Sequence, residues 1–237
     1  MNAELRALAD AVMYEGYMLW PYRASALKNR RRWTFGCVFP PAWTARHPDD
    51  GCMMRTQVRL ESDPAAVDVT VRFLCEGEER TVGPGAFDLG VVEVRVEGPR
   101  LTVEIRNTSL WDGEDRDEAL RHALGSAQTL LSGGRFVSAS ESDCTNVGTW
   151  PVLVGEDAML SSAIVLEDHP RIAPESPGDL FDGGEIDGLL ALNILALTDA
   201  EKDEMRLDPR TRAILERTEA LTEEQLWTLS GYRLERG

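Results

Sequence analysis

Residues 53–61 read MMRTQVRLE, and residues 67–74 read VDVTVRFL. In both stretches apolar side chains alternate with polar or charged ones. A period of two places the apolar and polar side chains on opposite faces of a β-strand. A strand with one apolar face is typical of an antiparallel sheet packed on a core, because buried parallel strands are apolar on both faces. The two stretches therefore predict strands of antiparallel sheets.

Similar patterns continue along the chain. Residues 91–96 and 101–105 flank EGPR at residues 97–100, and this arrangement predicts a hairpin. We expect the strands of residues 33–107 to form a sandwich or a curled sheet. Other apolar runs predict further strands at residues 33–39, 136–139, 150–154 and 160–166.

Helical patterns occur at the N-terminus, in the middle and at the C-terminus. Apolar residues at helical spacing predict a helix over residues 2–14, with Asn2 as its cap. A second helix is expected over residues 116–131, ended by Gly133 and Gly134.

The C-terminal part follows a loop rich in Pro, Gly and Asp at residues 170–184. A helix is expected over residues 186–197, and Pro209 suits the first position of a later helix. TDAE at residues 198–201 and TEEQ at residues 222–225 are capping-box sequences that open two more helices.

These patterns predict an α+β fold. The mainly antiparallel body, sandwich-like or curled, is expected over residues 1–184 and begins with the N-terminal helix. An acidic helical region is expected over residues 185–237, packed on this body.

Composition restricts the classes of partner. The chain has 237 residues, with 25 basic and 41 acidic side chains and a net charge of −16. Such a surface repels the phosphates of nucleic acids and the headgroups of anionic membranes, so we expect neither as a partner. The most apolar run, residues 189–197, is much shorter than the roughly 20 residues of a spanning helix, so no membrane insertion is expected.

The cysteines and the N-terminus indicate the compartment. The four cysteines are scattered, and none forms a CxxC pair. The first ten residues lack the basic segment and apolar core of a secretory signal. Both observations favour a cytoplasmic protein with reduced thiols.

Cys144 is the candidate catalytic residue. It lies in DCTNVG at residues 143–148, between the central helix and a strand that we expect. A loop cysteine acts as a nucleophile or a metal ligand when a base or further ligands lie beside it, and otherwise it is a packed or half-exposed thiol. Both alternatives stay open, since sequence alone does not locate its neighbours.

Three more residues join Cys144 as candidate metal ligands. His169 follows two acidic residues, and a histidine beside carboxylates is able to bind a divalent metal or to carry a proton. Asp179 and Asp182 lie in PGDLFDGGEID at residues 177–187, where the spacing of the acids differs from that of an EF-hand loop. Hydrogen-bonding by His169 and helix capping by the acidic turn are the simpler interpretations.

Aromatic and basic side chains are interleaved over residues 17–33. In a chain this acidic, the segment suits an acidic protein partner or an internal salt-bridge patch better than a nucleic acid. The candidate protein-interaction residues are Trp20, Tyr22, Arg23, Lys28 and Arg31.

The common catalytic and nucleotide-binding sequences are missing. The chain contains no GxxxxGK[ST], GxGxxG, GxSxG or HExxH. The sequence therefore requires no cofactor, and it favours a role other than catalysis.

Three stretches together resemble a known family. They are YEGY, PYRASALKN and RWTFG between residues 14 and 36, CTNVGTWPVLVG at residues 144–155, and SSAIVL with APESPGDLFDGGEID between residues 161 and 187. The chain is similar here to an uncharacterised bacterial family encoded in gene clusters of actinobacterial-type, oxygen-tolerant NiFe hydrogenases. The resemblance covers most of the chain but little of residues 43–131.

The resemblance implies an accessory protein in hydrogenase assembly or maturation. Its expected partner is a hydrogenase subunit or another maturation factor. Two alternatives remain: an enzyme that uses Cys144 on a small molecule or cofactor precursor, and a metal-binding carrier that uses Cys144, His169 and carboxylates.

Overall fold

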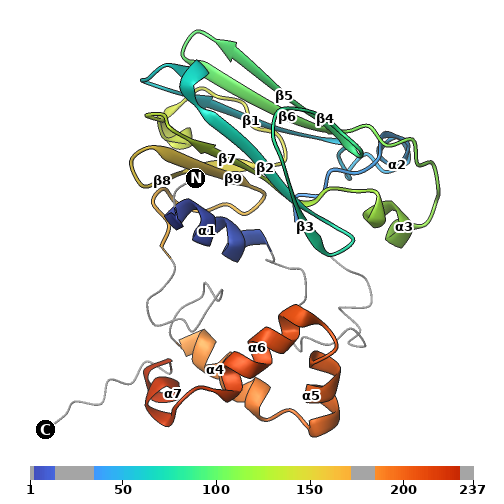
Figure 1. Ribbon diagram of the computed structural model, residues 1–237, viewed down its shortest axis with the longest axis vertical. Coiled ribbons are helices and arrows are strands. Elements are labelled where there is room, and N and C mark those ends of the chain that lie inside the picture. Colours follow the sequence, from blue (N-terminus) through green and yellow to red (C-terminus); the bar gives the residue numbers. More distant parts are fainter. Residues whose placement is uncertain (1–2, 14–34, 172–184, 230–237) are drawn as a thin grey trace, which may run out of the picture. The chain divides into compact units, whose positions relative to one another are not determined.

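The structure is a computed structural model that describes residues 3–13, 35–171 and 185–229. It divides into two compact units (Figure 1). The first, called the sandwich unit below, holds helix α1 (Ala3–Met13) and the described residues 35–170. The second, called the helical unit, holds the described helices of residues 185–229. The expected packing of the C-terminal region on the body stays a prediction.

The sandwich unit is built on two antiparallel sheets. In sheet order, the four-stranded sheet consists of β1 (Met53–Arg59), β6 (Arg100–Asn107), β5 (Gly90–Glu97) and β4 (Gly85–Phe87). The five-stranded sheet consists of β3 (Glu78–Val82), β2 (Asp68–Cys75), β7 (Gly125–Ser132), β9 (Ala158–Ser162) and β8 (Trp150–Val154). The predicted α+β fold with mainly antiparallel sheets is confirmed.

The apolar faces of the two sheets meet in one core. Val103 and Ile105 project from β6, while Phe73, Leu131 and Met159 come from the other sheet, and all five side chains are buried. The polar side chains that alternate with them therefore lie on the two outer faces of the sandwich.

Tight hairpins set the register. The predicted turn at residues 97–100 joins β5 to β6, where Glu97 pairs with Arg100. The β2–β3 hairpin, which the alternation did not reveal, turns at Glu76 (φ 53°) and Gly77 (φ 85°). Positive φ at both central residues is the requirement of a type I′ turn.

The prediction of one helix over residues 116–131 is wrong in its second half. Helix α3 (Arg116–Arg121) ends early, and the following residues form β7 instead. This strand is central in its sheet, between β2 and β9, and its side chains are buried on both faces. A strand buried on both faces shows no alternation of apolar and polar residues. The Ala, Gln and Leu residues of β7 therefore read like a helical sequence.

Two shorter strand predictions are also wrong in detail. Of the described residues in 33–39, only Val38 takes part in the β-structure, through an isolated bridge to Leu124. Gly36 adopts φ +63°, which interrupts an extended strand. Of residues 136–139, Phe136 alone makes a bridge, to Leu60, and a 3-10 turn begins at Ala139.

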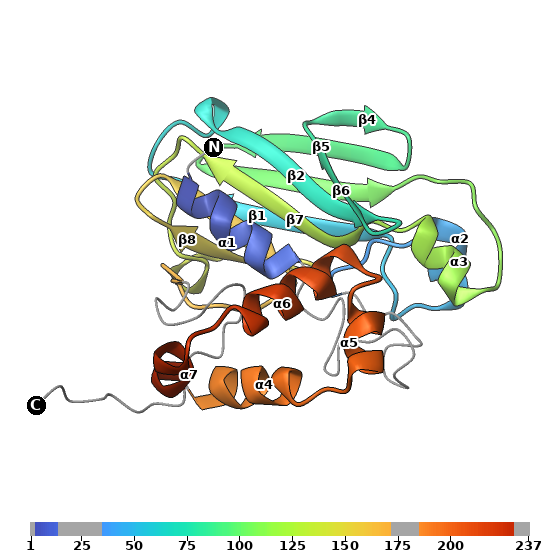
Figure 2. The same ribbon diagram turned by 60° about the horizontal axis from the view of Figure 1, so that its bottom comes forward.

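Helix α1, predicted from its period, packs on the outer face of the five-stranded sheet (Figure 2). The Arg72 side chain, only 1% exposed, lies 2.5 Å from Asp10 on the helix and 2.9 Å from Glu79 on β3. Gln128 on β7 donates a hydrogen bond of 3.1 Å to the carbonyl of Ala9. An ion pair and a hydrogen bond thus join this helix to the sheet beneath it.

The helical unit contains α4 (Glu185–Leu195), α5 (Asp199–Met205), α6 (Pro209–Glu219) and α7 (Glu223–Leu229). Both predicted capping boxes are present, at Thr198 before α5 and at Thr222 before α7. Ile194, Met205 and Leu215 form the buried centre of this unit. Of the helices described, none is both long and apolar enough to cross a bilayer.

Candidate functional site

The outer face of the four-stranded sheet carries a lattice of charged and polar side chains on β1, β6 and β5. The register of the paired strands determines which of these side chains lie side by side. Glu104 on β6 lies opposite Arg55 on β1 and opposite Glu93 on β5. Two residues after Glu93 on β5, Arg95 lies opposite Thr102 on β6. Because side chains alternate along a strand, residues in these rows point away from the core together.

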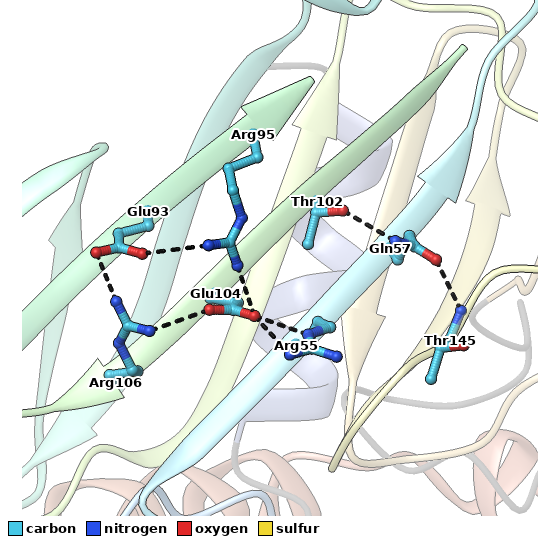
Figure 3. A network of polar contacts seen from close by, with 8 residues as sticks. All are labelled: Arg55, Gln57, Glu93, Arg95, Thr102, Glu104, Arg106 and Thr145. Carbon is cyan, nitrogen blue, oxygen red and sulfur yellow. Dashed lines mark hydrogen bonds and ion pairs between the residues drawn. The ribbon is translucent and has the colours of Figure 1, made fainter. Parts of the chain in front are cut away.

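Glu104 is the centre of this lattice (Figure 3). Its carboxylate lies 2.7 Å from Nη2 of Arg55 and 2.7 Å from Nη2 of Arg95. Nη1 of Arg106 lies 3.2 Å away. Glu93 contacts two of these three arginines: its carboxylate lies 2.5 Å from Arg106 and 3.8 Å from Arg95. Glu93, Arg106, Glu104 and Arg95 therefore close a ring of alternating charge, and Arg55 is an additional cation on Glu104.

The two glutamates of the ring differ in exposure. The Glu104 side chain is 4% exposed, whereas that of Glu93 is 40% exposed. Burial alone raises the pKa of the Glu104 carboxyl, but hydrogen bonds from Arg55 and Arg95 outweigh it and hold the pKa below its ordinary value. Glu104 is therefore ionised at neutral pH and acts as a fixed anchor for the arginines around it.

This surface is positive in an acidic chain. Alternation places five arginines and three glutamates on the outward side of β1, β5 and β6, while the whole chain carries −16. We call it the arginine face, and its charged residues are Arg55, Arg59, Arg95, Arg100, Arg106, Glu93, Glu97 and Glu104. Helix α1 covers the other sheet, and within the described part of this unit no comparable helix covers the arginine face (Figure 1).

The loop that carries Cys144 is fastened to one edge of the arginine face. Val147 exchanges two backbone hydrogen bonds with Arg55 on β1, of 2.9 and 3.0 Å. Gln57 uses its backbone N–H to donate to Asn146 Oδ1. Its side-chain Oε1 accepts from the N–H of Thr145 (Figure 3).

The other side of Cys144 is fastened as well. Asp143 lies 2.5 Å from Arg100 on β6, and this ion pair lowers the pKa of the Asp143 carboxyl. Cys144 itself is a free, half-buried thiol. It is therefore presented by a loop whose neighbouring residues on both sides are bonded to the sheet.

The predicted metal ligands do not come together within the described residues. In that part of the chain, no group of three or more His, Cys, Asp and Glu side chains is placed to hold a metal ion. The backbone N–H of His169 donates to the carbonyl of Leu153 on β8, whereas Cys144 lies beside β1. Asp179 and Asp182 lie outside the described residues, as do the candidate interaction residues Trp20, Tyr22, Arg23, Lys28 and Arg31.

The other two histidines are held in ring stacks away from Cys144. His47 stacks on Trp43 with ring centroids 3.7 Å apart, and His122 stacks on Trp111 at 5.6 Å. The two tryptophans contact each other at 6.3 Å. These four rings close one end of the sandwich beside α2 (Pro41–Arg46) and α3.

Sequence reasoning missed Glu104 and the arginines around it. Part of the signal was available, because the hairpin turn at residues 97–100 sets Glu93 opposite Glu104 and Arg95 opposite Thr102. The pairing of β1 with β6, which brings Arg55 to Glu104, joins strands more than forty residues apart in the sequence, as the hydrogen bond between these two side chains shows. No local pattern indicates such a pairing.

The chemistry of the arginine face is recognition of anions. A guanidinium presents a planar fork of N–H donors that matches a carboxylate or a phosphate with two parallel hydrogen bonds. Here several forks are held on a rigid sheet by one buried carboxylate. Comparisons with known proteins add no assignment, since no family model and no curated protein that was searched matches the chain.

Proposed function

We propose that this chain is a cytoplasmic accessory protein for NiFe hydrogenase maturation that acts by binding another protein. The hydrogenase context rests on the sequence resemblance, and one feature of the structure supports the proposed mode of action. The observation that supports binding is the arginine face, a sheet surface that no helix covers within the described part of the sandwich unit and whose guanidinium groups are anchored by Glu104.

Anchored arginines are well suited to protein binding. Arginine is enriched among the residues that contribute most to protein–protein affinity. A side chain that is already held in its bound geometry loses less conformational entropy when a partner arrives. Glu104 and Glu93 hold Arg95 and Arg106 in this way, while both arginine side chains remain 40–50% exposed.

The proposed partner is a hydrogenase subunit or another maturation factor. The experiment is deletion of the gene in its host, followed by complementation with the wild-type gene and with an Arg55→Glu/Arg95→Glu variant. We expect deletion to abolish hydrogenase activity while leaving hydrogenase transcripts unchanged, and the variant to restore little activity. The variant must accumulate to the wild-type level for the comparison to hold.

Affinity capture from the same host gives a direct readout. A tagged wild-type protein should bring down hydrogenase subunits or maturation factors, and the double variant should not. Normal hydrogenase activity in the deletion strain would overturn the proposal. Capture of unrelated proteins alone would remove the hydrogenase context.

A further inference from the structure

We propose that the arginine face binds an acidic segment of its partner protein, and that Glu93 occupies the place of a partner carboxylate until that segment arrives. This inference rests on the proposed protein-binding role and names the chemistry of the partner. It follows from the unequal positions of the two glutamates in the charged ring.

Glu104 is built as a permanent part of the face. Its side chain is 4% exposed and is in contact with Arg55, Arg95 and Arg106. Moving a buried carboxylate away from three cations is costly, because the short ion pairs would break and the cations would lose their partner. The arginines therefore keep their Glu104 contacts when other groups approach.

Glu93 is held more loosely. Its side chain is 40% exposed, and of its two arginine contacts only the one to Arg106, at 2.5 Å, is within hydrogen-bond range. The separation from Arg95 is 3.8 Å, beyond a hydrogen bond. An exposed ion pair of this kind contributes little free energy, so an incoming carboxylate replaces Glu93 at small cost.

The guanidinium groups have donors for such a replacement. Each arginine has five N–H donors, and the ring uses only some of those on Arg95 and Arg106. Arg95 and Arg106 start four residues apart in the register of β5 and β6, but both guanidinium groups reach the Glu104 carboxylate, at 2.7 and 3.2 Å, on the same sheet face. A partner carboxylate in the place of Glu93 therefore meets both groups at once.

Charge favours a short acidic protein segment over a nucleic acid. Arginines exceed glutamates on the face by only two, and the chain around it carries a net charge of −16. A long phosphate backbone would extend beyond the positive surface into repulsion. A few carboxylates fit within it.

The test compares two substitutions that change charge by the same amount. Binding of a fluorescently labelled, glutamate-rich peptide is measured by anisotropy at low salt, with a glutamine-matched peptide as the reference. Glu93→Gln removes the internal competitor, and we expect it to tighten binding about threefold. Glu104→Gln removes the anchor, and we expect it to weaken binding about tenfold although it also makes the face more positive.

Controls separate this mechanism from general electrostatics and from misfolding. Glu156→Gln, in the exposed turn between β8 and β9 of the other sheet, makes the same change of charge and should leave affinity unchanged. Arg95→Lys/Arg106→Lys keeps both charges and the fold but loses the planar forks, so binding should weaken about fivefold. This double variant keeps the test decisive even where Glu104→Gln impairs folding.

Three outcomes overturn the inference. They are equal effects of Glu93→Gln and Glu104→Gln, no binding of the acidic peptide to the wild type, and preferential binding of a single-stranded DNA competitor. The host deletion experiment reports on the proposed function independently. Loss of hydrogenase activity without peptide binding refutes the acidic-segment inference alone, and peptide binding with normal hydrogenase activity refutes only the hydrogenase role.

Discussion

The two outer faces of the sandwich each contain a buried charged side chain, and the chain covers them in different ways. Arg72 on the five-stranded sheet is 1% exposed beneath helix α1 and is paired with Asp10 and Glu79. Glu104 on the four-stranded sheet is 4% exposed beneath arginine side chains. A helix is a permanent cover, whereas the arginine side chains over Glu104 stay 35–50% exposed to solvent. The first face is therefore structural, and the second is suited to binding.

Removing the partners of Arg72 should have the largest effect on stability. In the variant Asp10→Asn/Glu79→Gln the buried guanidinium keeps its charge and loses both carboxylates. We expect the free energy of unfolding of the sandwich unit to fall by about 3–5 kcal/mol, because an uncompensated charge would remain buried. Urea denaturation followed by circular dichroism of the strands measures this change.

The matched control adds Arg72→Met to the same double variant. Replacing a whole buried ionic group by an apolar one of similar size is often neutral, so most of the lost stability should return. If the triple variant were as unstable as the double variant, the ion pairs would not be the cause. The face under α1 would then depend on packing alone.

Glu104→Gln should have a smaller effect, and this difference is the direct test of the comparison. The arginines that lose their carboxylate are 35–50% exposed and regain hydration from water. We therefore expect a loss of about 1–2 kcal/mol in the free energy of unfolding. A loss as large as that of Asp10→Asn/Glu79→Gln would show that the arginine face is structural as well.

The stability difference between wild type and Glu104→Gln should depend on pH. The pKa of Glu104 is lower in the folded state, so its ionisation stabilises the fold above the unfolded pKa of about 4.3. This contribution disappears as the pH falls through the folded pKa. The difference should be constant above about pH 5 and should shrink below about pH 4, as measured by urea denaturation at each pH. A constant difference throughout would exclude the charged form as its source.

The strands of this fold were predictable where one of their faces meets the core. The alternation in β1 and β2 and the turn between β5 and β6 required only local sequence. Strand β7 was hidden, because burial on both sides removes the alternation that identifies a strand.

The candidate site was less predictable than the fold. Polar residues at alternate positions indicated that Arg55 faces outward, but they did not indicate its partner. The ring of Glu93, Arg95, Glu104 and Arg106 lies within the β5–β6 hairpin, but Arg55 reaches Glu104 only through the pairing of β1 with β6. Register between distant strands is a property of the whole fold, which no short motif encodes. The interpretation of Cys144 had the same limit, since the neighbours of its loop come from β1 and β6.

The smallest effect is expected where the Cys144 loop meets the arginine face. Gln57→Ala removes the side-chain acceptor for the N–H of Thr145 and the donor to Thr102. We expect a loss of about 0.5–1.5 kcal/mol in global stability, because the backbone N–H of residue 57 still donates to Asn146. Locally the effect should be larger, with faster amide exchange at Thr145 and faster labelling of Cys144 by a thiol reagent.

The control for this variant is the thiol of Cys52, which is also half-buried and free but lies just before β1, outside the loop. Labelling of Cys52 should not change in Gln57→Ala, because only the loop loses a bond. Acceleration at both thiols would indicate general loosening of the sandwich instead. Selective acceleration at Cys144 would show that the arginine face holds its bordering loop in place, as it holds its own side chains.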